Sequence, residues 1–305
     1  MADSNKVGTR YSSSESRRKY LKNFTIATSI AASPVVGRVV AANDLSGVYE
    51  ANDEALYYVT QVGDRIYWAG EATKPSTRFG RGCSMIPFAN VLVGSVSNRG
   101  ATINAGWSDV PKGFIQGQGS MTLRARGRRL SRDSPSVGSG FGGSRWRRLR
   151  KRTWDRRRTR LERGETVDGV RLTDIDADSR ASARWTRAQF DWEIPDRITG
   201  TWRGDDGGTY YIRQMRTNIN EFGPNSATVV WFGERDLDWS NVFWGRLQEG
   251  ERTISGTWVD VPKGRATGRG TLELEIQSDV TLNRTGVTGG FGGRRWNRVI
   301  DNTCA

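Results

Sequence analysis

Short stretches of alternating apolar and polar residues recur along the chain, and turns rich in Gly, Asp, Asn and Pro separate them. Such alternation is typical of β-strands, because successive side chains point to opposite faces of a sheet. In the last third of the chain the pattern predicts eight strands, around residues 200–203, 209–215, 228–233, 241–247, 253–260, 270–276, 280–284 and 295–299. Eight antiparallel strands joined by short loops favour an up-and-down barrel.

The chain contains this pattern twice. Residues 106–113 (GWSDVPKG) align with residues 257–264 (TWVDVPKG), and the sequence Gly-Phe-Gly-Gly closes both copies, at 140–143 and 290–293. A repeat of this length is one structural unit, so each copy is expected to form its own barrel. The sequence therefore predicts an all-β protein of two tandem antiparallel eight-stranded barrels, joined by an Arg-rich linker.

The N-terminal region has the features of an export signal. Residues 16–22 (SRRKYLK) resemble the twin-arginine motif, in which Ser precedes a pair of Arg and an aromatic residue, Leu and Lys follow it. A modestly apolar stretch at 24–40 comes next, and Ala41 and Ala42 are small residues of the kind that signal peptidase accepts. The resemblance implies a prokaryotic protein that folds before export to the cell envelope or the medium. A mobile basic tail is the alternative.

These features divide the chain into five segments. We expect a twin-arginine signal peptide at 1–42, a first barrel at 43–148, a charged and largely disordered linker at 149–197, a second barrel at 198–300 and a tail at 301–305. No apolar run in the mature chain reaches the length that spans a bilayer, so no transmembrane segment is expected there.

The second copy also resembles known barrel families. Residues 198–202 (ITGTW) resemble the first hairpin of avidins, and the Gly-x-Trp start together with Arg298 is similar to lipocalins. The resemblance implies a calycin-type barrel, avidin-like or lipocalin-like. It does not extend to biotin binding, because the Asn and Ser with which avidins hold the ureido ring are replaced in the two copies by Gly204, Gly208, Ala51 and Ala55.

Alternation identifies the side chains that face the barrel interior. On the second and fifth strands, one face is nearly the same in both copies, and we expect it to line the interior. The other face of the second strand differs between the copies, with Tyr58 and Thr60 in the first and Tyr211 and Arg213 in the second. We expect this outer face to meet solvent. Aromatic walls with a few polar groups suit a small hydrophobic or glycan ligand. The candidate ligand-binding residues are Tyr57, Gln61, Trp68, Trp107, Asp109, Tyr210, Gln214, Trp231, Trp258 and Asp260. The alternative is that these side chains simply fill the barrels.

The composition argues against an enzyme. The chain has no His, and its two Cys, Cys83 and Cys304, cannot form a metal cluster alone. We therefore expect no catalytic residue, no metal and no cofactor, with a hydrolase that uses Asp205, Asp206, Asp236 and Asp238 as the less favoured alternative. The Asp-Val-Pro-Lys-Gly segments are expected to be structural, with Asp capping backbone amides and Lys pairing with that Asp.

Positive charge is concentrated in one region. The formal net charge is +14, and residues 124–163 alone carry +13. Such density can bind an acidic envelope polymer, anionic lipid or nucleic acid. The candidate polyanion-binding residues are Arg147, Arg148, Arg150, Lys151, Arg152, Arg156, Arg157 and Arg158. A solvated linker with at most a short helix is the alternative. The sequence thus favours an exported, non-enzymatic binding or envelope-associated protein, or else a structural protein with filled barrels whose linker binds polyanions.

Overall fold

The computed structural model describes residues 44–74, 86–97, 100–133, 137–138, 140–167, 197–215, 226–248 and 252–299. The expected signal peptide and tail, Cys83, Cys304 and most of the acidic stretch after the Arg-rich region lie outside the described residues.

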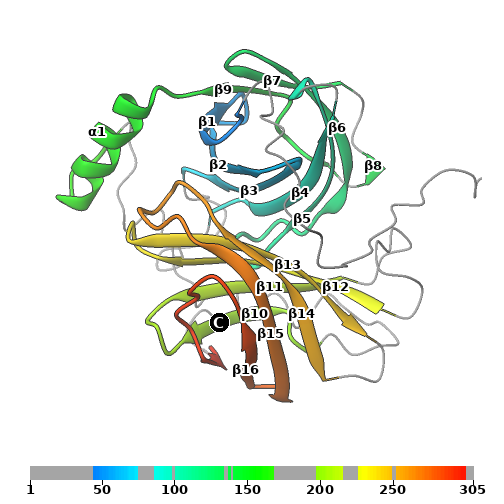
Figure 1. Cartoon of the computed structure of the whole chain (residues 1–305). Coiled ribbons are helices and arrows are strands. Elements are labelled where there is room, and N and C mark those ends of the chain that lie inside the picture. The colour runs from blue at the N-terminus through cyan, green and yellow to red at the C-terminus, as the bar shows by residue number, and fades with distance from the viewer. Residues whose placement is uncertain are drawn as a thin grey trace, which may run out of the picture. The chain divides into compact units, whose positions relative to one another are not determined.

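The first repeat forms a closed antiparallel barrel (Figure 1). Its strands are β1 (Gly47–Ala51), β2 (Ala55–Val62), β3 (Arg65–Ala72), β4 (Ala89–Ser97), β5 (Thr102–Asp109), β6 (Gln118–Arg126), β7 (Arg129–Arg132) and β9 (Arg145–Arg148). The barrel closes because β1 pairs with both β2 and β9, while β5 pairs with β6. A two-residue strand, β8 (Val137–Gly138), pairs with the start of β6.

The second repeat forms another closed barrel with the same order of strands. Its strands are β10 (Gly200–Gly204), β11 (Thr209–Met215), β12 (Ser226–Arg235), β13 (Trp239–Gln248), β14 (Thr253–Asp260), β15 (Arg269–Ser278), β16 (Thr281–Val287) and β17 (Arg295–Arg298). Each of the eight strands expected from the sequence overlaps one of these. The predicted fold class, all-β with two tandem antiparallel eight-stranded barrels, is confirmed.

Aromatic side chains fill much of each barrel interior. In the first barrel the Tyr57 ring lies 5.1 Å from that of Trp68 and 5.8 Å from that of Trp146. Phe141, from the first Gly-Phe-Gly-Gly segment, packs on Trp107 with ring centres 4.8 Å apart. Tyr210, Trp231, Trp258, Phe291 and Trp296 repeat the arrangement in the second barrel. Alternation therefore identified the interior positions correctly.

The outer faces of β2 and β11 do not meet solvent, and that expectation was wrong. Tyr58 is 0% exposed, Tyr211 2% and Arg213 5%. Tyr58 and Tyr211 belong to an apolar cluster that draws residues from both repeats, so each barrel covers the outer face of the other. The contacts are reciprocal. Arg213 donates to the Asp109 carbonyl at 3.0 Å, and the Thr60 hydroxyl donates to the Asp260 carbonyl at 2.8 Å.

Four buried charges lie in this interface between the repeats. Lys112 Nζ lies 2.7 Å from a Glu71 oxygen, Lys263 Nζ lies 3.0 Å from Glu71, and both lysines also pair with Glu234. Burial favours a raised pKa for Glu71, but Lys112 and Lys263 outweigh it and hold that pKa below its ordinary value. Lys112 and Lys263, the lysines of the two Asp-Val-Pro-Lys-Gly segments, thus pair with glutamates of both repeats. The prediction that each lysine pairs with the Asp of its own segment was wrong. The capping role of those aspartates is confirmed, because Asp109 accepts from the Gly117 amide at 2.6 Å.

Helix α1 (Lys151–Glu162) occupies the first part of the region between the barrels. Its buried residues are Trp154 and Leu161. The Trp154 ring lies 5.7 Å from that of Tyr58, and Leu161 packs with Val167 and with Leu237 of the second repeat. Glu162 pairs with Arg265 at 2.6 Å. One turn of the helix therefore contacts the first repeat and another contacts the second.

Candidate functional site

A pocket of about 330 Å³ opens at one end of the first barrel. The β1–β2 turn, the start of β2, the end of β5 and the Gly-Phe-Gly-Gly segment contribute to it. Its lining includes Asp53, Tyr57, Phe88, Asn90, Trp107, Asp109 and Phe141. Its size lies at the lower end of the range that proteins use for small ligands.

Two buried polar atoms in this pocket have no hydrogen-bond partner among the described residues, namely Asp53 Oδ1 and Trp107 Nε1. The other carboxylate oxygen of Asp53 accepts from the Tyr57 hydroxyl at 2.6 Å. Both atoms are buried in the pocket wall, near the partly exposed ring of Phe88. A buried polar atom without a partner costs about 1–3 kcal/mol, which a ligand that supplies the partner recovers.

Burial shifts the ionisation of both pocket carboxyls. It raises the pKa of Asp109 to about 7, although the hydrogen bond from the Gly117 amide and the charge of Arg213 act in the opposite direction. Burial also raises the pKa of Asp53, against the hydrogen bond from Tyr57. A ligand that donates hydrogen bonds or carries positive charge favours the ionised form of both groups.

The structure brings together three of the five candidates predicted in the first barrel. Tyr57, Trp107 and Asp109 line the pocket. Trp68 lies behind Tyr57 and donates to Asn90 Oδ1 at 3.1 Å. Gln61 lies at the other end of β2, where it accepts from the Leu45 amide at 3.0 Å, so it helps to close that end of the barrel.

The corresponding side chains of the second barrel form the same framework. Tyr210 donates to Asp206 at 2.5 Å, and Trp231 donates to Asn241 at 2.8 Å. Trp258 donates to the Thr288 carbonyl at 3.1 Å. Asp260 accepts from the Gly268 amide at 2.5 Å, and burial raises its pKa to about 6. The Gln214 backbone amide donates to Thr199 Oγ1 at 2.9 Å, in the region that corresponds to Gln61.

One pair of residues distinguishes the two barrel ends. Trp239 stands in the second repeat where Phe88 stands in the first, and its ring lies 5.6 Å from that of Tyr210. The Trp239 ring also occupies the place of a side chain at Gly208, whose counterpart in the first repeat is Ala55. The second barrel thus uses its own indole to fill the space beside Tyr210. The smaller Phe88 ring lines an open pocket beside Tyr57.

Sequence reasoning missed Asp53, Phe88 and Asn90 as pocket residues. Asp53 and Asn90 fall in turns or strand ends that align with Asp206 and Asn241, so the repeat itself contained the signal. The Phe88 to Trp239 difference was also visible, but its effect depends on which neighbours the fold places around the ring.

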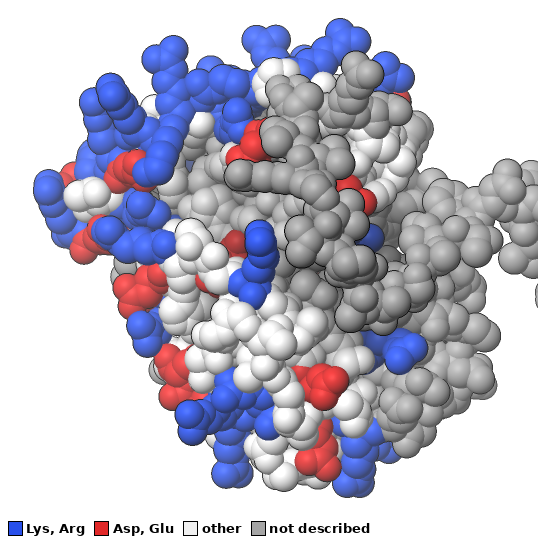
Figure 2. All heavy atoms as spheres, in the orientation of Figure 1, with Lys and Arg blue, Asp and Glu red and all other residues white. Residues whose placement is uncertain are grey.

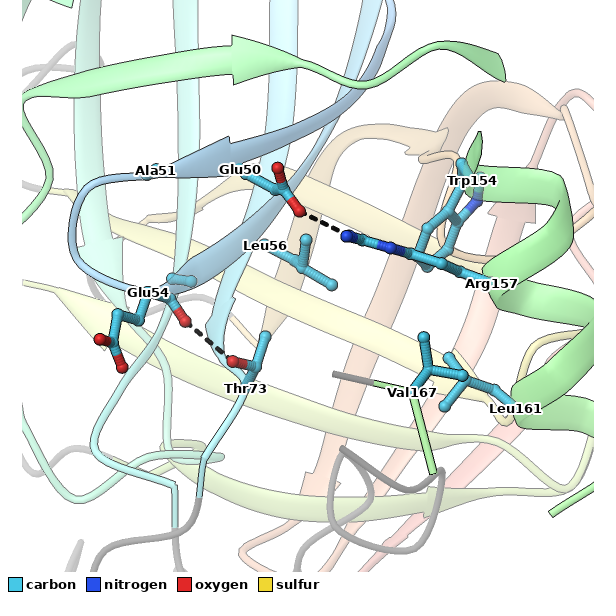
Figure 3. A pocket seen from close by; sticks show the side chains of 10 residues that line it. Glu50, Ala51, Glu54, Leu56, Thr73, Trp154, Arg157, Leu161 and Val167 are labelled. Carbon is cyan, nitrogen blue, oxygen red and sulfur yellow. Dashed lines mark hydrogen bonds and ion pairs between the residues drawn. The ribbon is translucent and has the colours of Figure 1, made fainter. Parts of the chain in front are cut away.

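A second hollow, of about 250 Å³, lies between α1 and the β1–β2 hairpin (Figure 3). Arg157 points across it to Glu50 at 2.6 Å, and Leu56, Leu161 and Val167 supply apolar surface. The Thr73 hydroxyl donates to the Glu54 carbonyl at 2.8 Å. Because these polar groups are paired with one another, this hollow offers mainly apolar contact.

The polyanion-binding candidates separate into two groups. Arg148, Arg157 and Arg158 are partly buried and bind acceptors of the protein itself, such as Glu50 for Arg157. The exposed candidates are Arg147, Arg150, Lys151, Arg152 and Arg156. They lie with further exposed arginines of β6, β7 and β9, and Figure 2 shows Lys and Arg gathered over this part of the surface. We call the exposed Arg and Lys side chains of residues 124–129 and 145–156 the basic face.

Neither a protein-family model, nor a curated protein, nor a solved structure matches this chain. The geometry alone therefore defines the class, a tandem antiparallel β-barrel protein with a pocket at one end of its first barrel. Within the described residues, no group of three or more Cys, Asp or Glu side chains is arranged to hold a metal ion. No helix in that part of the chain is long and apolar enough to cross a membrane.

Proposed function

We propose that this protein is an exported, non-enzymatic binding protein of the calycin type, whose first barrel holds a small ligand at its open end. The observation that carries the proposal is the difference between the two barrels. Asp53 Oδ1 and Trp107 Nε1 lie unpartnered among the described residues beside the pocket of the first barrel, and Trp239 fills the matching space in the second. Duplication followed by such divergence suits one binding barrel and one supporting barrel.

The ligand is a small molecule or glycan with one apolar face and at least one hydrogen-bond donor. Phe88, which is only partly buried, offers aromatic surface of the kind on which sugar rings and other flat groups stack. Asp53 and Asp109 accept hydrogen bonds from hydroxyl or amino groups, and the Trp107 indole donates one.

Export rests on the resemblance of residues 16–22 to the twin-arginine motif. The non-enzymatic assignment rests on the absence of His, the residue that most often serves as a general base at neutral pH. N-terminal sequencing of the protein from its own host tests export. A mature chain that starts near Asn43 supports it, and an intact N-terminus outside the cytoplasm contradicts the signal peptide.

Calorimetric titration against a panel of mono- and oligosaccharides and small aromatic amines tests the pocket. The key variant is Ala55→Gly with Phe88→Trp, which copies the filled arrangement of the second barrel. The control is Gly208→Ala with Trp239→Phe, which changes only the second barrel. Binding that the first pair abolishes and the control pair retains supports the proposal. Equal binding by wild type and the Ala55→Gly, Phe88→Trp variant overturns it.

A further inference from the structure

The basic face combines segments that are separate in the sequence. β7 pairs with both β6 and β9, so the arginines of the β6–β7 hairpin lie beside those of β9. Helix α1 begins three residues after β9 and adds the charges of its first turns. Lys and Arg side chains gather over these elements in Figure 2. The fold thus extends the Arg-rich segment of the sequence into a broader surface.

Like charges stand directly opposite each other on this surface. Arg126 is the cross-strand partner of Arg129, and Arg129 is in turn the partner of Arg147. Directly opposed like charges destabilise a sheet. A bound polyanion reverses this effect, because each anionic group then lies between two guanidinium groups.

Among the described residues, few acidic side chains pair with the basic face. Arg124 pairs with Asp133 at 2.7 Å, Arg147 pairs with Glu50 at 3.3 Å, and Lys151 pairs with Asp155 at 2.7 Å. Six arginines of the face form no ion pair with an acidic side chain among the described residues, namely Arg126, Arg129, Arg145, Arg150, Arg152 and Arg156. Within the described parts of the chain, most of the basic side chains of this face therefore have no acidic partner.

The chemistry of the face favours phosphate groups. It consists almost entirely of arginine, whose planar guanidinium binds phosphate through two parallel hydrogen bonds. The tryptophans of these elements, Trp146 and Trp154, are 1% and 5% exposed, so no aromatic side chain of β9 or α1 is free to stack on a base. The large apolar side chains exposed in the described part of the chain are Ile115, Val280 and Val287. They lie outside the elements that form the basic face, which disfavours insertion of this face into a bilayer.

We propose that the basic face binds a linear polymer through a series of its phosphate groups. The ligand is a polymer with a repeating phosphate or phosphodiester group. The face recognises the charge and the spacing of these groups and makes no contact with bases. Inorganic polyphosphate and a poly(glycerol phosphate) of the cell envelope share this chemistry. The proposal does not depend on the pocket of the first barrel.

Fluorescence anisotropy with the full chain tests it, using labelled polyphosphate, labelled poly(glycerol phosphate) and an oligo(dT) of matched charge. We expect the two phosphate polymers to bind at least as tightly as oligo(dT), and binding to weaken steeply with salt. The variant Arg126→Gln, Arg129→Gln, Arg147→Gln should bind at least tenfold more weakly. Its slope of log affinity against log salt should fall by about two, as expected for the loss of three contacts.

The matched control is Arg269→Gln, Arg294→Gln, Arg295→Gln, which removes the same charge from exposed positions of the second barrel. It should bind within twofold of wild type. Equal losses in both triple variants would show that only net charge matters, and would overturn the proposal. Tighter binding to oligo(dT) than to either phosphate polymer, or binding to anionic vesicles alone, would overturn it in favour of a nucleic acid or a membrane.

Discussion

Lys112 of the first repeat forms an ion pair with Glu234 of the second, and the two side chains are 0% and 3% exposed. The reciprocal pair, Lys263 with Glu71, completes the cluster. Equivalent residues thus exchange partners across the interface, as they do at a two-fold axis between identical subunits. The interface between the repeats therefore has the form of a symmetric dimer within one chain, and the barrels are expected to unfold together.

Removing one of these lysines should destabilise the protein strongly. Lys112→Met leaves two buried carboxylates facing a single lysine, and breaking such a buried network costs about 3–5 kcal/mol. Urea unfolding measures the change. Lys74→Met is the control, because the Lys74–Glu54 pair is exposed and pairs of that kind contribute at most about 1 kcal/mol. Similar losses in the two variants would contradict a special role for the buried cluster.

Asp109 should make the protein less stable as the pH rises from about 4 to about 7. Its pKa is about 7 in the folded protein, whereas an Asp side chain has an ordinary pKa of 3.8. Between these values the unfolded chain loses the proton and the folded protein keeps it, so the contribution to stability is full below the lower value and is lost as the pH rises.

The variant Asp109→Asn should flatten this decline in urea midpoints measured at pH 4, 5, 6 and 7. Asn retains an oxygen that can accept from the Gly117 amide, so the fold has no other reason to change. Asp238→Asn, at an exposed position, serves as the control and should leave the profile as it is in wild type. An undiminished decline in Asp109→Asn would show that other groups cause it.

Gly208 and Trp239 should behave as a coupled pair. An added Cβ at Gly208 meets the Trp239 ring, so Gly208→Ala should lose about 1–3 kcal/mol through overpacking. Adding Trp239→Phe should restore part of that loss, because the smaller ring copies the Ala55 and Phe88 arrangement of the first barrel. A double-mutant cycle by thermal or urea unfolding measures the coupling, and simple additivity would contradict the contact.

Arg129 should lower the free energy of unfolding when no polyanion is bound. Removing its charge relieves the repulsion from Arg126 and Arg147, so Arg129→Gln should stabilise the protein by about 0.2–1 kcal/mol at low salt. High salt should erase the gain, because it screens exposed charges. Thermal unfolding at two salt concentrations measures it. Arg269→Gln, at an exposed position of the second barrel, should show a smaller change.

The sequence by itself determined the strands, the duplication and the residues that face each barrel interior. Alternation and turn residues are local signals, and the interior of a barrel is built from the same alternating faces that form its strands. Tyr57, Trp107 and Tyr210 were therefore predicted correctly as interior residues. The capping role of Asp109 was predictable as well, since it depends on the amide of Gly117, eight residues along the same chain segment.

Only the tertiary structure decided what the outer faces do. Tyr58 and Arg213 alternate as surface residues, and both are buried. Trp154 of α1 and Lys263 of the second repeat lie against Tyr58, and Asp109 and Gly117 of the first repeat accept from Arg213. The partnership of Lys112 with Glu234, and the open pocket beside Phe88, likewise depend on groups that approach from distant parts of the chain. The periodicity of a strand shows which of its faces is apolar. Whether a polar outer face is buried depends on the surface that packs against it, which the local sequence does not contain.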